Sequence, residues 1–372
     1  MRILVTGAAG FIGKNLIETL RREGYDDIIS CTLETSDREL EEALKSCDFV
    51  FHLAGVNRPK EEREFMEGNG DFTERLVKLA EAGGKLPPIL LTSSIQAGLN
   101  NPYGESKRVA EEIVFTYGKE NQVPVYVYRL PNVFGKWSRP NYNTVVATFC
   151  HQIARGLPIR IDNPDSILHL VYIDDVIGQF LRILKTGIRL PAGEFVTFPP
   201  RLIYETTVGD LSKLIHSFRE SRENLLLPDL GDPFTKKLYS TYLSFLPEDS
   251  FSYELETHCD ERGSFTEFLK SPDRGQVSVN VSKPGITKGQ HWHHTKNEKF
   301  LVVSGRACIR FRKIGEEKVI EYHVSGDRPE VVDIPTGYTH NIENEGEGDL
   351  VTLMWANEIF DPDHPDTYRE EV

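Results

Sequence analysis

No stretch of this chain is apolar enough over the ~18–20 residues that a transmembrane helix requires. Positive charge is also scarce, because 43 Lys and Arg residues stand against 57 Asp and Glu residues and give a net charge of −14. A nucleic-acid surface needs clustered Lys and Arg, so the composition argues against that class of partner. The sequence enters directly into a strand-like segment at residues 3–5 with no signal-peptide pattern, and we expect a cytoplasmic protein without a membrane partner.

Cysteine is scarce as well, with five residues scattered at positions 31, 47, 150, 259 and 308. An odd number without regular spacing does not support a disulfide framework. We interpret these residues as reduced thiols, and the simplest expectation is that they are buried as small apolar side chains.

The first part of the chain alternates short apolar strands with helical patterns. Strands are predicted at residues 2–6, 28–33, 49–53, 89–92 and 125–128, with helices at 12–23, 72–82 and 104–118. This alternation predicts an α/β domain, a Rossmann-like doubly wound parallel sheet with helices on both faces. One further helix is expected at residues 207–217, and the domain is predicted to span residues 1–245.

The last part of the chain has a different texture, and residues 244–252 read as a linker. Short strand-like segments separated by turns occur at residues 276–281, 300–303, 307–311, 319–323, 331–334 and 350–355. Short strands at this spacing predict an all-β antiparallel sandwich or barrel. We assign this second domain to residues 253–372.

Three glycines, Gly7, Gly10 and Gly13, follow the first strand and precede the first helix. In a nucleotide-binding loop, the first glycine permits a tight turn and the second lets the backbone approach a pyrophosphate. The third allows close packing of helix on strand, and the helix N-terminus favours the charge of the phosphate. Their position between a strand and a helix therefore predicts a dinucleotide site.

Tyr103 and Lys107 are four residues apart, one turn of a helix, and Ser94 stands at the end of an earlier strand. Reduction of a ketone needs a hydride and a proton, and free tyrosine has a pKa near ~10. A neighbouring lysine can lower that pKa, so Tyr103 would act as acid and base. In the alternative interpretation, Tyr103 is a surface aromatic residue and Lys107 a solvated charge.

These motifs resemble those of the extended short-chain dehydrogenase/reductase family. The likeness rests on the spacing of the glycine loop, on Tyr103 and Lys107, and on further segments at residues 48–55, 92–94, 129–135 and 171–176. It implies a catalytic triad of Ser94, Tyr103 and Lys107, with Ser94 as donor to the substrate oxygen and Lys107 as a ligand of the cofactor ribose. The implied cofactor-binding residues are Gly7, Gly10, Phe11, Ile12, Gly13, Leu53, Ala54, Gly55, Tyr103 and Lys107.

Two absent features narrow the expected cofactor and the expected reaction. Relatives that prefer NAD place an acidic residue at the end of the second strand, but residues 28–33 contain no Asp and Glu34 comes late. We therefore expect NADPH, with Lys14 or Arg38 as the cationic partner of its 2′-phosphate. Sugar-nucleotide dehydratases of this family carry an acidic pair after the catalytic serine or threonine. Residues 95–96 read Ile-Gln instead, which disfavours dehydration.

The C-terminal part carries a second set of motifs. Gly285, His291, His293, Glu298 and Gly305 have the spacing of the first cupin motif, and Pro335, Gly337, His340 and Asn344 match the end of the second. Two histidines that are two residues apart on a strand share one face, as chelation from a barrel wall requires. The resemblance implies a cupin barrel in which His291, His293, Glu298 and His340 bind a metal ion.

Three imidazoles and one carboxylate suit zinc, iron, manganese or nickel, and the residue types alone do not choose among them. We expect Zn²⁺, because redox chemistry at the metal has no evident place in this reaction. The metal could polarise a ketone as a Lewis acid or brace the barrel. His294 and His323 lie outside the motifs; one could be a base, but solvent exposure is the simpler interpretation.

A reductase domain followed by a metal-binding cupin resembles the family of bifunctional capsular-polysaccharide enzymes of the CapF type. The resemblance implies a UDP-2-acetamido-2,6-dideoxy-4-ketohexose substrate, epimerised at C3 by the cupin domain and reduced at the C4 ketone by the reductase domain with NADPH. The product would be UDP-2-acetamido-2,6-dideoxy-L-talose, on the pathway to UDP-N-acetyl-L-fucosamine. The family pattern also implies a homodimer.

Two other functions remain open at the level of sequence. A nucleotide-sugar 4-epimerase with a cupin appendage would hold NAD tightly and would consume no added NADPH. A non-catalytic sugar or redox sensor would have no need of Ser94, Tyr103 and Lys107. The bifunctional assignment has a sensible order of steps, because a C4 ketone acidifies the C3 proton and its later reduction fixes the new stereochemistry.

Overall fold

The computed structural model describes residues 1–142, 144–191 and 193–372. These residues form two compact units. The first comprises Met1–His216 and Gly231–Pro247, and the second Ser217–Leu230 and Glu248–Val372. The division into a reductase domain at residues 1–245 and a metal-binding domain at residues 253–372 stays a prediction.

A five-stranded parallel sheet with strand order β2-β1-β3-β4-β5 forms the centre of the first unit. Its strands are β1 (Ile3–Thr6), β2 (Ile28–Cys31), β3 (Phe49–His52), β4 (Ile89–Ser94) and β5 (Val125–Leu130). The helices that follow them are α1 (Phe11–Arg22), α2 (Asp37–Ser46), α3 (Arg63–Phe65) with a π-helical turn (Met66–Asp71), α4 (Phe72–Gly83) and α5 (Pro102–Asn121). Parallel strands need such crossover connections, and the α/β fold predicted from the sequence is confirmed.

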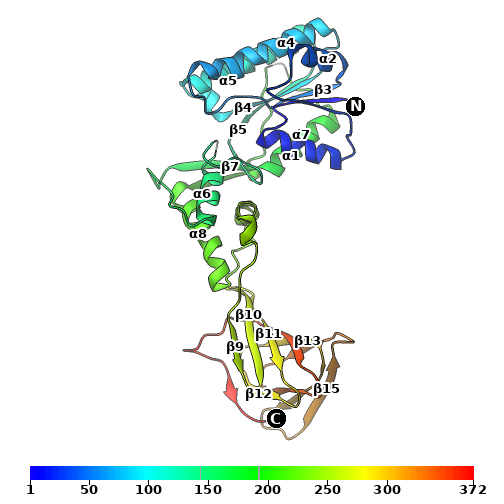
Figure 1. Cartoon of the computed structure of the whole chain (residues 1–372), viewed down its shortest axis with the longest axis vertical. Helices are drawn as coiled ribbons and strands as arrows, with labels where there is room; N and C mark the ends of the chain where they lie inside the picture. The colour runs from blue at the N-terminus through cyan, green and yellow to red at the C-terminus, as the bar shows by residue number, and fades with distance from the viewer. Residues whose placement is uncertain (143, 192) are drawn as a thin grey trace. The chain divides into compact units, whose positions relative to one another are not determined.

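Helices cover both faces of this sheet, because successive residues of a strand point to opposite sides. Ile3 and Val5 pack in the core formed with α1 and with α7 (Ile173–Thr186). Leu4 lies in a separate core with α2, α4 and α5. Figure 1 shows α1 and α7 on one side of the sheet and α2, α4 and α5 on the other. Burial on both faces explains why these strands are apolar throughout.

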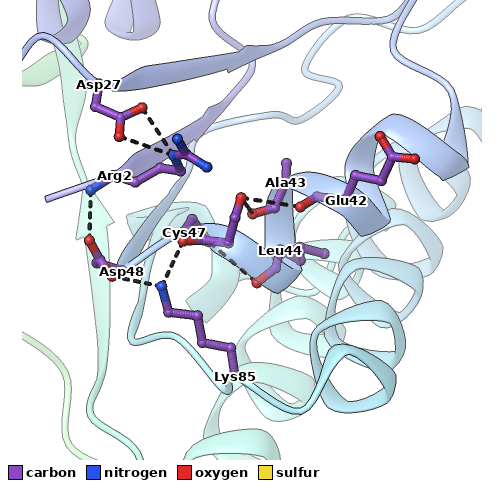
Figure 2. Close-up of polar contacts among 9 residues, drawn as sticks. Arg2, Asp27, Glu42, Ala43, Leu44, Cys47, Asp48 and Lys85 are labelled. Carbon is purple, nitrogen blue, oxygen red and sulfur yellow. Dashed lines mark hydrogen bonds and ion pairs between the residues drawn. The ribbon is translucent and has the colours of Figure 1, made fainter.

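Polar contacts link the segments at the amino-terminal ends of the strands of this sheet (Figure 2). The Arg2 side chain donates to the Asp27 carboxylate at 3.0 Å, and the Arg2 backbone N–H donates to Asp48 at 2.7 Å. Lys85 donates to the same Asp48 carboxylate at 2.7 Å, so the segments before β1, β2, β3 and β4 are linked. These side chains are about half exposed, and each pair adds little stability. These contacts lie at the amino-terminal ends of the strands. The carboxyl-terminal ends, where the glycine loop lies, are left free for a ligand.

The first unit also contains a three-stranded sheet of β6 (Asn132–Phe134), β7 (Ile167–Tyr172) and β8 (Ile203–Thr207), in that order. The remaining helices are α6 (Val145–Ala154), α9 (Pro233–Leu243) and α8 (Val208–Asn224), whose residues from Ser217 onward belong to the second unit. Short 3₁₀ turns lie at Ile95–Gly98 and Pro200–Leu202, and a further one in the second unit at Glu248–Ser250. Phe234 of α9 packs against Phe134 and Tyr204, with ring centres 5.9 and 5.2 Å away. Aromatic contacts therefore tie α9 to the small sheet.

The second unit is a barrel of two antiparallel sheets, ordered β16-β13-β18-β11-β10-β9 and β15-β14-β17-β12-β19. The strands are β9 (Thr257–Asp260), β10 (Gly263–Ser271), β11 (Gly275–Ser282), β12 (Thr287–Trp292), β13 (Glu298–Ser304), β14 (Arg306–Lys313), β15 (Val319–Ser325), β16 (Val331–Ile334), β17 (Tyr338–Asn344), β18 (Leu350–Ala356) and β19 (Tyr368–Arg369). Phe300, Ile309 and Ile342 are among the buried residues of its core. The all-β C-terminal fold expected from the sequence is confirmed.

Four of the five cysteines are buried, as expected, but Cys259 is exposed. Cys259 lies on β9, an edge strand whose four residues are all exposed, so the expectation of burial is wrong there. Within the described ranges, no helix has the length and apolar character needed to cross a membrane.

Candidate active sites

The glycine loop joins β1 to α1 in a conformation that glycine adopts without strain. Gly7 has a φ of +66°, and a Cβ atom there would lie 2.8 Å from the backbone nitrogen of Ala54. A Cβ at Gly13 would lie 2.3 Å from the carbonyl oxygen of Gly7, so helix and loop meet backbone to backbone. Gly10 precedes α1 without a side-chain cap, which leaves the first N–H groups of the helix for phosphate oxygens.

A cavity of about 590 Å³ lies beside this loop. Its lining includes the predicted residues Gly7, Gly10, Phe11, Ile12, Gly13, Leu53, Gly55, Ser94, Tyr103 and Lys107. Ala54 is not among the described lining residues, but its backbone borders Gly7. One cavity thus holds both the predicted nucleotide loop and the predicted triad. The roles of these residues stay proposals.

The triad residues come from two adjacent elements. Ser94 ends β4, while Tyr103 and Lys107 occupy the first turns of α5, which Asn101 caps. Burial raises the pKa of Tyr103, and a hydrogen bond with Ser94 offsets part of that rise. The expected net lowering of this pKa is therefore wrong, because desolvation is the largest effect and raises it. A tyrosine in this site keeps its proton at neutral pH, as the acid of a reduction must.

Lys107 is itself buried, with 7% of its surface exposed. Burial lowers the pKa of Lys107 to about 8, although Glu111 opposes the shift. The Lys107 Nζ lies 5.9 Å from the Tyr103 ring centre and 3.4 Å from the carbonyl oxygen of Thr92. A Cβ at Gly55 would lie 2.9 Å from this Nζ, so the glycine leaves room for the lysine head group.

Two side chains that support the triad were missed by the sequence analysis. The Asn69 amide holds the backbone of Val56 through two hydrogen bonds of 3.0 Å. The Glu111 carboxylate accepts from the Ser93 hydroxyl at 2.5 Å and from Arg129 at 2.6 and 2.9 Å. Glu111 lies one helical turn after the triad lysine, which was its only sequence signal. Asn69 had none, since its contacts depend on the folded chain.

A second cavity, of about 690 Å³, borders the end of β2. Its lining includes Lys14, Arg21 and Thr32, and Lys14 also lines the first cavity. Arg38, the other cation suggested for a 2′-phosphate, pairs with Glu42 at 3.1 Å on the exposed face of α2 and lines neither of these cavities in the described chain. The positions of these side chains therefore favour Lys14 over Arg38 as the cation for the expected 2′-phosphate.

The four predicted metal ligands converge inside the barrel. Their ligand atoms all lie within 4.8 Å of one another. The Glu298 Oε2 lies 3.4 Å from His293 Nε2 and 3.3 Å from His340 Nε2, and the rings of His291 and His340 are 4.6 Å apart. His291 lies on β12, His293 in the turn after it and His340 on the neighbouring strand β17. Glu298 begins β13 in the other sheet.

This cluster fits a metal ion. Tetrahedral zinc with bonds of about 2.0–2.1 Å separates its ligand atoms by roughly 3.3 Å. The Nε2 atoms of His293 and His340 and Oε2 of Glu298 are buried without a conventional hydrogen-bond partner in the described residues. Burial lowers the pKa of His291 to about 4, which keeps it in the neutral form that binds metal. Burial opposes ionisation of Glu298, but the two imidazoles hold its pKa well below the ordinary value.

The segment before β19 closes one side of this cluster, which the sequence analysis missed. His293 Nδ1 lies 2.5 Å from the carbonyl oxygen of Asp366, so the ring donates there and directs Nε2 inward. The Asp366 carboxylate accepts from the backbone N–H groups of His294, Thr295 and Lys296 at 2.7–2.9 Å. These bonds hold the turn that follows His293. His294 and His323 are exposed, as the simpler interpretation expected.

A Rossmann-like domain whose cavity gathers the predicted triad, combined with a β-barrel whose four predicted ligands converge, defines the class of this protein. Residues 3–196 match the NAD dependent epimerase/dehydratase family, and residues 258–368 match the polysaccharide biosynthesis C-terminal domain. The chain belongs to the NAD dependent epimerase/dehydratase family, in the branch that carries this C-terminal domain.

The relatives narrow the comparison further. A Pseudomonas aeruginosa protein named UDP-2-acetamido-2,6-beta-L-arabino-hexul-4-ose reductase is 47% identical over 372 residues, covering 100% of this chain and 99% of its own. The crystal structure of the capsular polysaccharide assembling protein CapF from Staphylococcus aureus matches with a TM-score of 0.92 and 52% identity over 100% of both chains. A UDP-glucuronic acid 4-epimerase from Bacillus cereus, with a TM-score of 0.52 and 20% identity over 59% of this chain and 83% of its own, shows the fold alone.

Proposed function

We propose that this chain is a bifunctional nucleotide-sugar enzyme that epimerises C3 of a UDP-2-acetamido-2,6-dideoxy-4-ketohexose and then reduces its C4 ketone. The product is UDP-2-acetamido-2,6-dideoxy-L-talose, a precursor of UDP-N-acetyl-L-fucosamine for capsular polysaccharide. One observation carries the proposal: Ser94, Tyr103, Lys107 and the glycine loop line one cavity, in a chain that matches a UDP-4-ketosugar reductase along its full length.

The reductase residues have separate tasks. NADPH, when bound, supplies the hydride that adds to C4. Tyr103 gives its proton to the C4 oxygen, and its raised pKa keeps that proton in place at neutral pH. Ser94 donates a hydrogen bond to the same oxygen, which stabilises the developing negative charge. Lys107 holds the ribose of the cofactor.

The preference for NADPH is supported by the surroundings of β2. Thr32 and Lys14 line the cavity where an acidic residue would otherwise bind a ribose 2′-hydroxyl. A cation and a hydroxyl at this place suit a 2′-phosphate. Arg21 lines the same cavity and adds a second positive charge, while Glu18 adds a negative charge there.

His291, His293, Glu298 and His340 would hold the metal of the barrel, and Zn²⁺ fits their spacing. A bound ion would polarise the ketone as a Lewis acid, and it would also join the two sheets from which these ligands come. The homodimer and the cytoplasmic location stay predictions, and light scattering and fractionation of cells would test them.

Incubation of the purified chain with the UDP-4-ketosugar and NADPH in D₂O tests the proposal. We expect oxidation of NADPH together with deuterium at C3 of the product, because solvent exchange precedes reduction. Tightly held NAD and no net use of NADPH would support the 4-epimerase alternative instead. No turnover and no exchange with such sugars would contradict the proposal.

A further inference from the structure

The metal cluster does not account for every ionisable group in the barrel. A cavity of about 360 Å³ contacts three of the proposed ligands, His291, Glu298 and His340. Lys288 lines the same cavity from strand β12. An amine inside a barrel, beside a site proposed to move a proton at carbon, requires an explanation.

An irregularity in β12 places Lys288 on the inner face. Residues three apart on a regular strand point to opposite faces. Here the pairing with β17 runs from Lys288 opposite Ile342 to His291 opposite His340, with a bulge between Gly289 and His291. Directly opposed residues share a face, and the partners Ile342 and His340 are two apart, so Lys288 and His291 face the same side.

The backbone of the bulge is unusual. Gly289 and Gln290 both have positive φ, +101° and +62°. A non-glycine residue in this conformation is uncommon and costs energy, and bulges often redirect side chains at active sites. Lys288 and His291 are therefore neighbouring inward-facing residues of β12, roughly 7 Å apart along the strand at about 3.4 Å per residue.

The contacts of Lys288 hold its amine in one place. Its Nζ donates to Asn280 Oδ1 at 2.8 Å and to the Val281 carbonyl oxygen at 2.8 Å. Asn280 is 3% exposed, and its own amide nitrogen donates to Ser282 at 3.2 Å, which fixes its orientation. A neutral amine has two hydrogens, so both acceptors can be satisfied while the lone pair stays free to take a proton.

Burial favours release of the Lys288 proton, and the two nearest charges oppose each other. Burial lowers the pKa of Lys288, Asp260 opposes the shift, and Arg262 adds to it. The Asp260 carboxylate is already bound by the Arg262 side chain at 2.6 Å. No carboxylate forms an ion pair with Lys288 among the described residues.

The other ionisable groups on the cavity wall, apart from the proposed ligands, are Glu267, Lys296 and Glu358. Glu267 pairs with Lys270 at 2.8 Å, and Lys296 donates to Thr367 at 2.9 Å. Glu358 lies in the loop after β18 and is half-buried. Lys288 differs from these groups because it lies on a strand, faces the inside of the barrel and is held by two hydrogen bonds.

We propose that Lys288 is the base that removes the C3 proton of the 4-ketosugar in the barrel, an inference that rests on the proposed epimerase function. The C3–H bond breaks, its electron pair forms a C3–C4 double bond, and the C4 carbonyl becomes an enolate oxygen. Lys288 becomes an ammonium group. Water then protonates the opposite face of C3, the C4 carbonyl re-forms, and the ammonium returns its proton to the hydroxide.

Deuterium entry at C3 in D₂O without NADPH tests this role. Lys288→Arg keeps the charge and the donors but cannot give up a proton at neutral pH, and Lys288→Ala removes the amine. Both should slow exchange at least ~100-fold, since a general base contributes 10²–10⁴-fold. Lys283→Met is the control, because Lys283 is exposed and pairs with Asp349 outside the cavity.

Small primary amines should restore exchange to Lys288→Ala, with rates that rise with the basicity of the amine. Metal content and unfolding temperature are measured for each variant. Wild-type exchange rates in folded, metal-bound Lys288→Arg, or no rescue of folded Lys288→Ala by any amine, would overturn the role of Lys288. Absence of exchange in the unaltered protein would instead overturn the epimerase function. NADPH oxidation with a C3-epimerised 4-ketosugar should be unchanged in all variants.

Discussion

Glu298 and His340 meet across the barrel, with Glu298 Oε2 3.3 Å from His340 Nε2. One residue belongs to β13 of the first sheet and the other to β17 of the second. His340 is 1% exposed, so the pair lies where water cannot screen it. Unless an ion lies between the ligands, these buried polar atoms lack hydrogen bonds, which costs about 1–3 kcal/mol per group.

Removal of the metal should therefore destabilise the barrel. Binding at a free concentration of 100 Kd stabilises a fold by about 2.7 kcal/mol. For a barrel of this size that energy corresponds to roughly 10 °C in Tm. We expect a strong chelator to lower the barrel's unfolding transition by that order and to leave the transition of the first unit unchanged, as measured by calorimetry.

Variants of the ligands should reproduce the effect of the chelator. His291→Ala combined with His340→Ala should abolish metal binding by elemental analysis. His258→Ala is the matched control, because His258 is exposed on β9 and lies outside the cluster. A metal content of one per chain in the double variant would show that the proposed ligand set is incorrect.

Tyr103→Phe should separate the two activities. The variant keeps the aromatic ring but has no proton to give, so NADPH oxidation should fall by a factor of about 10²–10⁴ or more. Exchange at C3 should continue, because the barrel carries it. Tyr25→Phe, which removes a hydroxyl from the same unit outside the described linings of the cavities, serves as control. NADPH turnover at the normal rate in Tyr103→Phe would rule out Tyr103 as the acid.

Parts of both predicted signatures are visible in the sequence because neighbouring residues encode them. The glycine loop needs only the short segment between β1 and α1, and the first two proposed metal histidines are two residues apart, at the end of β12 and in the turn after it. The sequence pattern gave no bounds for β12 and β17, and only the cupin resemblance placed their histidines on strands. Their inner positions hold Lys288, His291 and His340 in place of apolar residues, so the function itself removed the hydrophobic pattern.

Other features depend on parts of the chain that meet only after folding. Asp366 reaches the turn after His293 from 72 residues away, and Glu111 on α5 accepts from Arg129 on β5. The pKa of Tyr103 depends on desolvation as well as on charge, and the spacing of Tyr103 and Lys107 reports only the charge. Sequence patterns thus locate the reacting groups, whereas their electrostatics require the packed structure.

The buried Lys107 predicts a pH dependence for the reductase. Its pKa is lowered to about 8, so the group is a cation below that pH and neutral above it. If the charge helps to hold the ribose and stabilise the C4 oxygen, kcat/KM for reduction should fall as the pH rises through about 8. Lys107→Arg keeps its charge over this range, so its residual activity should not fall there. The check is a pH profile of both proteins with saturating NADPH.

Lys14 should control the choice between NADPH and NADH. It lines both cavities at the glycine loop, and a cation that contacts a 2′-phosphate contributes about 1.5–3 kcal/mol. Since ~1.4 kcal/mol is a factor of ten, Lys14→Ala should raise the KM for NADPH at least tenfold and leave that for NADH nearly unchanged. Arg38→Ala is the control, because Arg38 pairs with Glu42 on the exposed face of α2. An equal loss with both cofactors would place Lys14 at the shared pyrophosphate, and a selective loss in Arg38→Ala would place the 2′-phosphate near α2 instead.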